Sequence, residues 1–456
     1  MKLYIILLLI GLLSLNGCSS ATALADESFE TTVNMTEPLS DENYLLNAPL
    51  RSKITYLIDD SENVVHEWVS QYYPGNATYL LEDGLLLRTG SFGRNNPTGF
   101  TAGGAGGIIQ LLGPDSTVLW EYAIADDLHL SHHDVEYLPN GNILAIVWQK
   151  KTAQEAISVG RNPESLNDKE LWPDKIVELK PIGQNEAEIV WEWNTWDHLI
   201  QEFDTSKATF GSVENHPEKI DINYLGNSRE QGGADWNHMN SVDYNAELDQ
   251  ILLSVHTFNE VWIIDHDTTT EEAAGEKGDL LYRWGNPQAY NQGTAKDQIL
   301  SGQHDAQWIE AGKDGEGNIL LYNNNGGTMQ NQYSTIVEIT PPLTESKTYQ
   351  YDTQLGYGPN TTSWQFGYEE NQYFYSRSIS GVQRLANGNT LICVGEDGYF
   401  AEITPEGQQV WGYLNPYGDS RPGQNTNSET SYNPVFKIRK YSITDTLLKT
   451  LLNDDK

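Results

Sequence analysis

Cysteines and basic residues are scarce in this sequence, and a long apolar run occurs only at its start. The 456 residues include two cysteines, and 27 Lys and Arg stand against 64 Asp and Glu, which gives a formal net charge of −37. The shortage of Lys and Arg argues against nucleic acid as a partner, because binding to phosphate backbones depends on clustered basic residues. The acidity favours a saline or extracytoplasmic setting and indicates nothing about the fold.

Apolar and aromatic residues are abundant enough for a large folded core. Hydrophobic residues make up 38% of the chain and aromatic residues 11%, which argues against a disordered protein. A chain of this length predicts about three domains or one large closed β architecture.

The first residues resemble a bacterial lipoprotein signal. Lys2 precedes the apolar run Leu3–Leu13, which is too short for an ordinary membrane span, and Leu15-Asn16-Gly17 leads to Cys18. We expect cleavage before Cys18 and a lipid on its sulfur. A plain signal peptide cut nearby is the alternative. A lipidated Cys18 would leave Cys393 without a disulfide partner.

These features predict four regions. Residues 1–17 form the signal peptide, residues 18–50 a polar tether, residues 51–443 the folded domain and residues 444–456 a C-terminal tail. The expected location is extracytoplasmic, as a periplasmic or outer-membrane lipoprotein that meets the membrane only through its lipid anchor.

Two kinds of hairpin alternate through the rest of the chain. The first is a β-run, a polar turn and a second β-run that ends in aromatics. Its six copies are Lys53–Ser70, Ile108–Ile124, Ile176–Asn194, Val261–Pro287, Thr335–Asp352 and Tyr399–Pro416. The second contains a tight polar turn, often Asn-Gly or Asp-Gly, which indicates a hairpin because both central turn residues need positive φ. Its five copies are Thr78–Leu87, His133–Trp148, Ser241–His256, His304–Tyr322 and Ser380–Gly395.

One pair of hairpins makes one four-stranded antiparallel sheet. The repeat therefore predicts an all-β chain, folded as a six-bladed β-propeller with four-stranded antiparallel blades. One blade lacks its second hairpin, and we expect Pro434–Ile443 to supply the missing inner strand beside Lys53–Ser70. N- and C-terminal strands would then close the ring. A β-sandwich with fortuitous repeats is the alternative.

Half of the ten histidines lie at the ends of the second hairpin. They are His132, His133, His238, His256 and His304. If this hairpin opens each blade, these imidazoles meet at one mouth of the central channel. Asp134 and Asp305 follow two of them and could fix a ring tautomer, although a local backbone role is equally compatible with their position.

A ring of imidazoles is compatible with several chemistries. Neutral histidine is a nucleophile and a metal ligand, and imidazolium protonates leaving groups or binds anionic oxygens. No His-Glu-x-x-His, paired cysteine or EF-hand motif favours a metal site. The glycine run Gly103–Gly107 lacks the lysine and helix of a phosphate-binding loop, so we infer no cofactor and no metal. Core histidines beneath blade turns are the structural alternative.

Four segments resemble the bacterial arylsulfate sulfotransferases, and they occur in the order found in that family. The segments are Ser131–Ile146, Asp235–Tyr244, Gly302–Tyr322 and Gly381–Gly395, within a resemblance that covers about residues 50–442. The resemblance implies a six-bladed propeller that moves a sulfuryl group from an aryl sulfate to a phenolic acceptor, without a nucleotide donor, through a sulfated histidine.

The same resemblance implies roles for individual residues. His304 corresponds to the nucleophile, His238 and Asn240 to ligands of the sulfuryl oxygens, and His133 to a further anion-binding imidazole, with His132 as its neighbour. His238 is also a candidate proton donor.

One departure from the family concerns a missing arginine. Better-known relatives carry Arg where this chain has His256, which loses the bidentate guanidinium contact with a tetrahedral anion. Arg377 is a candidate replacement, and Ser380 corresponds to a family serine or threonine. Trp236 is a candidate platform for an aryl ring, although such residues more often belong to the blade core.

Two other functions remain open from the sequence. A hydrolase or lyase acting on sulfated or acidic glycans could use the same histidines, and a non-catalytic binding propeller needs none of them. The natural donor and acceptor and the oligomeric state are not encoded in any motif we find.

Overall fold

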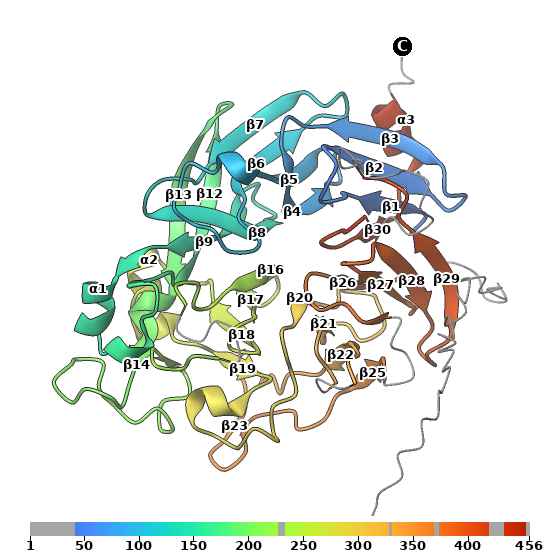
Figure 1. Ribbon diagram of the computed structural model, residues 1–456. Helices are drawn as coiled ribbons and strands as arrows, with labels where there is room; N and C mark the ends of the chain where they lie inside the picture. The colour runs from blue at the N-terminus through green and yellow to red at the C-terminus, as the bar shows by residue number, and fades with distance from the viewer. Residues whose placement is uncertain (1–41, 227–232, 328–330, 369–373, 419–432, 453–456) are drawn as a thin grey trace, which may run out of the picture.

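The computed structural model describes residues 42–226, 233–327, 331–368, 374–418 and 433–452. Six four-stranded antiparallel sheets are arranged around a central channel, so the predicted all-β six-bladed propeller is confirmed (Figure 1). The predicted signal peptide, Cys18 and most of the predicted tether lie outside the described residues and stay predictions. In the described part of the chain, no helix has the length and apolar character needed to cross a membrane.

The first five blades follow one another along the chain, each with its inner strand first. The first three blades are β4 (Tyr73–Leu80), β5 (Leu86–Ser91), β6 (Gly107–Leu112) and β7 (Val118–Ala123), then β8 (His129–Tyr137), β9 (Ile143–Gln149), β12 (Asp174–Ile182) and β13 (Glu186–Asn194), then β16 (Met239–Asn245), β17 (Gln250–Val255), β18 (Glu260–Asp265) and β19 (Tyr282–Trp284). The fourth and fifth are β20 (His304–Trp308), β21 (Ile319–Asn323), β22 (Thr335–Ile339) and β25 (Trp364–Phe366), then β26 (Gly381–Arg384), β27 (Thr390–Val394), β28 (Tyr399–Ile403) and β29 (Gln409–Leu414).

The sixth blade joins the two ends of the chain. Its strands, from the channel outward, are β30 (Arg439–Tyr441), β1 (Tyr44–Asn47), β2 (Ile54–Asp59) and β3 (Val64–Val69) (Figure 1). The expected closing strand is therefore present, but it pairs with β1 instead of lying directly beside the Lys53–Ser70 hairpin. Because Tyr44–Asn47 pairs with β2, the blades begin before the predicted boundary at residue 51.

One outer strand also differs from the prediction. The hairpin expected over Thr335–Asp352 does not form, because β22 pairs instead with β25. Tyr351–Asp352 is a short strand, β23, that pairs with β24 (Gly356–Tyr357) in a separate ribbon. The other short strands are β10 (Lys151–Thr152), β11 (Glu170–Leu171), β14 (Leu199–Ile200) and β15 (Ile220–Asp221), and the α-helices are α1 (Ala153–Ser158), α2 (Thr270–Ala273) and α3 (Asp445–Leu452). Short 3-10 helices are η1 (Gly93–Asn95), η2 (Pro163–Ser165), η3 (Thr195–His198), η4 (Glu276–Gly278) and η5 (Pro287–Tyr290).

The hydrophobic core lies between blades rather than in one central mass. Six clusters of buried apolar side chains each join two neighbouring sheets around the ring. Hydrogen bonds from outer-strand tryptophans add to these contacts. Trp120 of β7, in the first blade, donates to Glu186 O in the second blade at 2.8 Å. Trp364 of β25, in the fourth blade, donates to Pro405 O in the fifth blade at 2.8 Å. Tryptophans of the outer strands thus connect adjacent blades.

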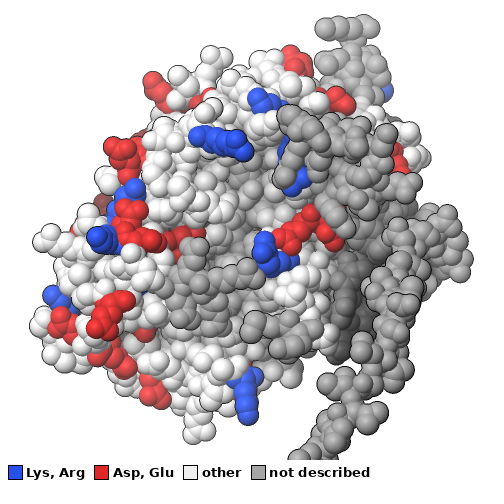
Figure 2. Space-filling view, in the orientation of Figure 1, with Lys and Arg blue, Asp and Glu red and all other residues white. Residues whose placement is uncertain are grey.

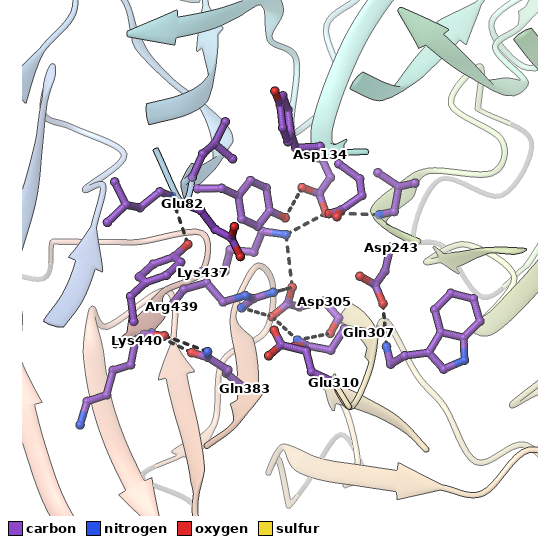
Figure 3. A pocket seen from close by; sticks show the side chains of 18 of the residues that line it. Glu82, Asp134, Asp243, Asp305, Gln307, Glu310, Gln383, Lys437, Arg439 and Lys440 are labelled. Carbon is purple, nitrogen blue, oxygen red and sulfur yellow. Dashed lines mark hydrogen bonds and ion pairs between the residues drawn. The ribbon is translucent and has the colours of Figure 1, made fainter. Parts of the chain in front are cut away.

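A buried group of four charges, here called the central ionic cluster, fills the channel between the inner strands. Asp134 of β8 and Asp305 of β20 contact Lys437 Nζ at 2.8 and 3.3 Å, and Arg439 of β30 makes a bidentate contact with Asp305 at 2.7 and 2.9 Å (Figure 3). Burial would raise the pKa of Asp305, but Arg439 and Lys437 outweigh it and lower that pKa to about 2. The closing strand is therefore attached to two blades on the other side of the channel.

We predict that Lys437→Met destabilises the fold by about 3–5 kcal/mol, because removal of one partner leaves buried Asp134 without its cation. Thermal or urea unfolding measures the loss. Lys277→Met is the matched control, since the Lys277–Glu272 pair is 63% and 41% exposed and exposed pairs contribute little. Equal stability of both variants would contradict a structural role for the central ionic cluster.

Candidate active site

Five imidazoles form a continuous line at the end of the channel where the inner strands begin. From His132 the ring centroids are separated by 5.1 Å to His133, 4.7 Å to His238, 5.0 Å to His256 and 5.4 Å to His304. The structure therefore brings together all five histidines that the hairpin pattern singled out.

Phe436, just before β30, closes this line into a ring. Its side chain lies 6.0 Å from the ring of His133 and 6.3 Å from that of His304. The sequence analysis did not identify Phe436, because it belongs to the closing strand and to no repeated hairpin.

Local backbone irregularities aim these side chains toward the channel mouth. The register of β8 shifts between Ser131 and Val135, and that of β20 shifts between His304 and Gln307. His133 and His238 take left-handed φ angles of 55° and 52°, which few residues other than glycine adopt. Such bulges re-aim side chains at the rims of β structures.

His304 is neutral and carries a defined tautomer. Its Nδ1 lies 2.8 Å from Asn324 Oδ1 and 3.1 Å from Gly302 O, and both atoms are acceptors. Nδ1 therefore carries the proton, and Nε2 keeps its lone pair. Burial, with a smaller contribution from His238, lowers the pKa of His304 to about 4.

His238 is the imidazole that holds a positive charge most readily. Its Nδ1 contacts the carboxylate of Asp235, three residues earlier. Burial opposes protonation, but Asp235 outweighs it and raises the pKa of His238. Burial and the neighbouring His238 lower the pKa of His133 and His256 well below the ordinary value. His238 is therefore the member of the ring that is most readily protonated.

Asn240 and Ser380 lie beside this ring in different roles. Asn240 is buried and donates from Nδ2 to Gln303 O at 2.7 Å, directly before His304. Ser380 Oγ accepts from the Gly395 amide at 2.9 Å, and the carbonyl oxygen of the preceding residue, Ile379, accepts from Asn324 Nδ2 at 2.9 Å. Ser380 thus supports the loop behind Asn324.

Two predicted substrate-binding residues have partners other than the site histidines. The guanidinium of Arg377 is 56% exposed and pairs with Glu396 at 3.5 Å, so its role as a replacement for the missing arginine stays a prediction. Trp236 is buried in the core, packs on Phe258 and donates from Nε1 to Tyr224 O at 3.0 Å. An aryl ring cannot reach a face that core residues already cover.

The predicted alternatives for Asp134 and Asp305 are resolved in favour of a structural role. Asp134 accepts from the amides of Val135 and Val242, and Asp305 accepts from that of Val382. The carboxylates that do contact the site histidines come from Asp235 and Asp174. Asp235 lies in the recognised Asp-Trp-x-His segment and could have been found there, whereas no motif marks Asn324.

A cavity of about 900 Å³ occupies the opposite end of the channel and is lined by none of the site histidines. Asp134, Asp305, Lys437 and Arg439 form its floor, so the central ionic cluster separates this cavity from the imidazoles (Figure 3). On the face shown in Figure 2, described Lys and Arg side chains are scattered among acidic ones. Within the described residues, no group of three or more His, Cys, Asp and Glu is arranged to hold a metal ion.

A six-bladed propeller with a buried imidazole ring at one channel mouth defines a class of enzyme suited to nucleophilic and acid–base chemistry. The family model described as "Arylsulfotransferase (ASST)" matches residues 54–435. The chain therefore belongs to the arylsulfotransferase family. Membership supports sulfotransferase activity, with an aryl sulfate as donor and a phenol as acceptor in the family's general reaction.

Solved structures match the chain at low identity. A Bacteroides caccae protein of unknown function is 12% identical, with 87% of this chain and 97% of that chain covered and a TM-score of 0.45. Virginiamycin B lyase from Staphylococcus aureus is 10% identical, covering 83% and 87%, with a TM-score of 0.36. A periplasmic gluconolactonase from Pseudomonas aeruginosa is 10% identical, covering 82% and 95%, with a TM-score of 0.37. No curated protein matches the chain by sequence.

We predict that Gly104→Ala lowers sulfotransfer at least about tenfold, because misplacement of a reacting group by about 1 Å is costly. A Cβ at Gly104 would lie 2.1 Å from Cε1 of His133, so the imidazole must move. Gly93→Ala is the control: Gly93 also has positive φ, at +56°, but a Cβ there meets no atom within 4 Å. Initial rates with an aryl sulfate and a phenol test this expectation, and equal rates for both variants would contradict it.

Proposed function

We propose that this protein transfers a sulfuryl group from an aryl sulfate to a phenol by a ping-pong reaction, with a covalent intermediate on Nε2 of His304. The observation that carries the proposal is the fixed tautomer of His304. Asn324 and Gly302 hold its Nδ1 proton, and its low pKa keeps Nε2 unprotonated at neutral pH. A neutral imidazole nitrogen is a competent nucleophile.

In the first half-reaction, Nε2 of His304 bonds to sulfur while the bond between sulfur and the aryl oxygen breaks. The leaving oxygen takes both electrons of that bond. His238 supplies its Nε2 proton to this oxygen, because Asp235 holds the Nδ1 proton on the other side of the ring. A phenol leaves, and the sulfuryl group stays on His304.

In the second half-reaction, the acceptor phenol loses its proton to Nε2 of His238. Its oxygen bonds to sulfur while the bond between sulfur and His304 breaks, which restores the neutral imidazole. The same residue thus acts first as acid and then as base.

Positioning and charge stabilisation carry most of such a transfer, since little covalent chemistry is left to the protein. Asn240 supports this role because an amide nitrogen has two N–H groups and one is used on Gln303 O. His133 and His256 lie on either side of His238 and supply further nitrogens to sulfuryl oxygens.

We predict that His304→Asn abolishes transfer from a chromogenic aryl sulfate to added phenol. Asn offers no nucleophilic ring nitrogen at the position of Nε2. His216→Asn is the matched control, because His216 is half-exposed and pairs only with Glu218 outside the ring. Mass spectrometry of quenched wild-type protein is expected to find a sulfuryl group on the peptide that contains His304. Full turnover by His304→Asn would refute the nucleophile assignment.

Acceptor dependence separates transfer from hydrolysis in the same assay. A transferase releases the donor phenol faster when an acceptor phenol is added, whereas a hydrolase releases sulfate into water regardless of acceptor. Release that is independent of acceptor would replace the proposed function with hydrolysis.

We predict that Asp235→Asn moves the alkaline limb of donor cleavage to lower pH. Asp235 raises the pKa of His238, so its loss lowers that pKa, and the Nε2 proton is lost at lower pH. The effect is expected with phenyl sulfate, whose leaving group has a pKa of about 10 and needs protonation. The rate of the first turnover against pH measures it. An unmoved limb would exclude His238 as the acid.

We also propose that the enzyme is extracytoplasmic and anchored through a lipid on Cys18. The support is the Leu-Asn-Gly-Cys segment after an apolar run. Incorporation of a labelled fatty acid that persists in Cys18→Ser would contradict this anchor.

A further inference from the structure

Behind His133, two buried side chains extend a line of hydrogen bonds away from the channel. Nδ1 of His133 lies 2.8 Å from Nδ1 of His132, and Nε2 of His132 lies 3.0 Å from Oδ1 of Asp174, the first residue of β12. The side chains of His132 and Asp174 have no solvent exposure. The ring of His132 stacks on Trp148 with centroids 3.9 Å apart and planes 8° apart. The line is therefore held in one geometry.

The carboxylate at the end of this line is fixed as well. Oδ2 of Asp174 accepts from the Met239 amide at 2.7 Å, and the amide of Asp174 donates to Asn237 Oδ1 at 3.1 Å. Rotation of the carboxylate would break the Met239 contact, so Oδ1 stays directed at His132.

Where Asp174 is ionised, as at alkaline pH, these contacts determine where the protons lie. An ionised carboxylate only accepts, so Nε2 of His132 then carries a proton toward Asp174. Nδ1 of neutral His132 is then an acceptor, and the short contact between two nitrogens makes Nδ1 of His133 the donor. Nε2 of His133 is left with a lone pair, which cannot donate to a sulfuryl oxygen.

One added proton reverses the direction of every hydrogen bond along this line and creates no new charged group. When Nε2 of His133 takes up a proton, its Nδ1 proton passes to Nδ1 of His132, and the Nε2 proton of His132 passes to Oδ1 of Asp174. The products are a neutral His133 that donates from Nε2, a neutral His132 and a carboxylic acid. Burial favours this outcome, because it lowers the pKa of His133 and raises that of Asp174.

We propose that Asp174, His132 and His133 form a proton relay that couples binding of the sulfuryl anion to uptake of one proton. His132 and Asp174 are positioning residues, and His133 is the group that touches the sulfuryl oxygen. Asp174 becomes protonated, and so neutral, when the negatively charged substrate binds. The net charge of the buried site therefore stays the same, and an anion can bind there without an arginine. The proposal rests on the proposed function for the identity of the anion, but the proton arrangement does not.

Other titratable groups adjoin the relay and must be separated from it. Those that face His133 are His238, His256 and His304, and the groups that act electrostatically on Asp174 are Asp235 and His238. His238 is the main competitor, because above its own pKa it is neutral in the free protein and could take up a proton when an anion binds. Asp174→Asn and Asp235→Asn therefore form a matched pair, each removing one carboxylate from a different histidine.

The test is calorimetric titration of the whole protein with benzenesulfonate in buffers of different ionisation enthalpy. Benzenesulfonate offers the same three oxygens, but its sulfur is not transferred. We expect about one proton taken up per molecule bound at alkaline pH by the wild type and by Asp235→Asn, and close to none by Asp174→Asn. The Kd of the wild type is expected to rise about tenfold per pH unit where uptake is complete.

A second variant keeps the packing while it breaks the line. His132→Phe leaves a flat ring on Trp148 and removes both nitrogens, so proton uptake is lost. His198→Phe is the control for stability, since His198 also pairs with a buried carboxylate, Asp279, and stacks on Trp193 at 5.2 Å and 6°. His198→Phe is expected to retain uptake.

Three outcomes would overturn one or the other of two statements. Binding by the wild type without proton uptake, or uptake retained in Asp174→Asn, refutes the relay and leaves the proposed sulfotransferase intact. Failure of the wild type to bind benzenesulfonate at any pH contradicts the proposed function itself.

Discussion

The buried contact of Lys437 and Arg439 with Asp134 and Asp305 is the constraint on which the rest of the structure depends. It attaches the closing strand to two other blades across the channel. Each aspartate directly follows a histidine of the imidazole ring, so the same contact fixes the backbone on which His133 and His304 are mounted. The same ion pairs thus stabilise the closed ring of blades and determine the geometry of the imidazole site.

The proposed site would bind an anion inside a protein of strongly negative net charge. The chain carries a net charge of −37, and Lys437 and Arg439 in the channel are already paired with carboxylates. Neutral imidazoles, a histidine whose pKa Asp235 raises, and the proposed neutralisation of Asp174 would together limit the net charge of the site. In a buried setting that arrangement costs less than isolated charges do.

Much of the architecture was readable from the sequence because hairpin repeats have a strict physical signature. Asn-Gly turns and alternating apolar runs predicted the blades, and the positions of five histidines on one hairpin type predicted their meeting. What failed depended on long-range packing. β22 pairs with β25 instead of with the segment near Asp352 that the sequence predicted. β1 begins before the expected domain boundary at residue 51. The side chain of Trp236 is buried in the core.

The finer design of the site was less visible. Asp134 and Asp305 sit next to histidines in the chain, yet left-handed φ angles at His133 and Asp305 turn neighbouring side chains to different partners. Asn324 and Asp174 orient site histidines from other strands, and no local pattern ties them to His304 or His132. Such partnerships arise from the closed ring and are absent from any short window of sequence.

The sixth blade combines strands β1, β2 and β3 with β30, which lies far from them in the sequence. This arrangement has a consequence for biosynthesis. All five histidines precede residue 305, whereas Phe436, Lys437 and Arg439 are synthesised after them. A nascent chain therefore holds the five imidazoles before it holds the groups that close the ring around them. The ring of side chains can take its final geometry only after the closing segment has been synthesised and has joined the sixth blade.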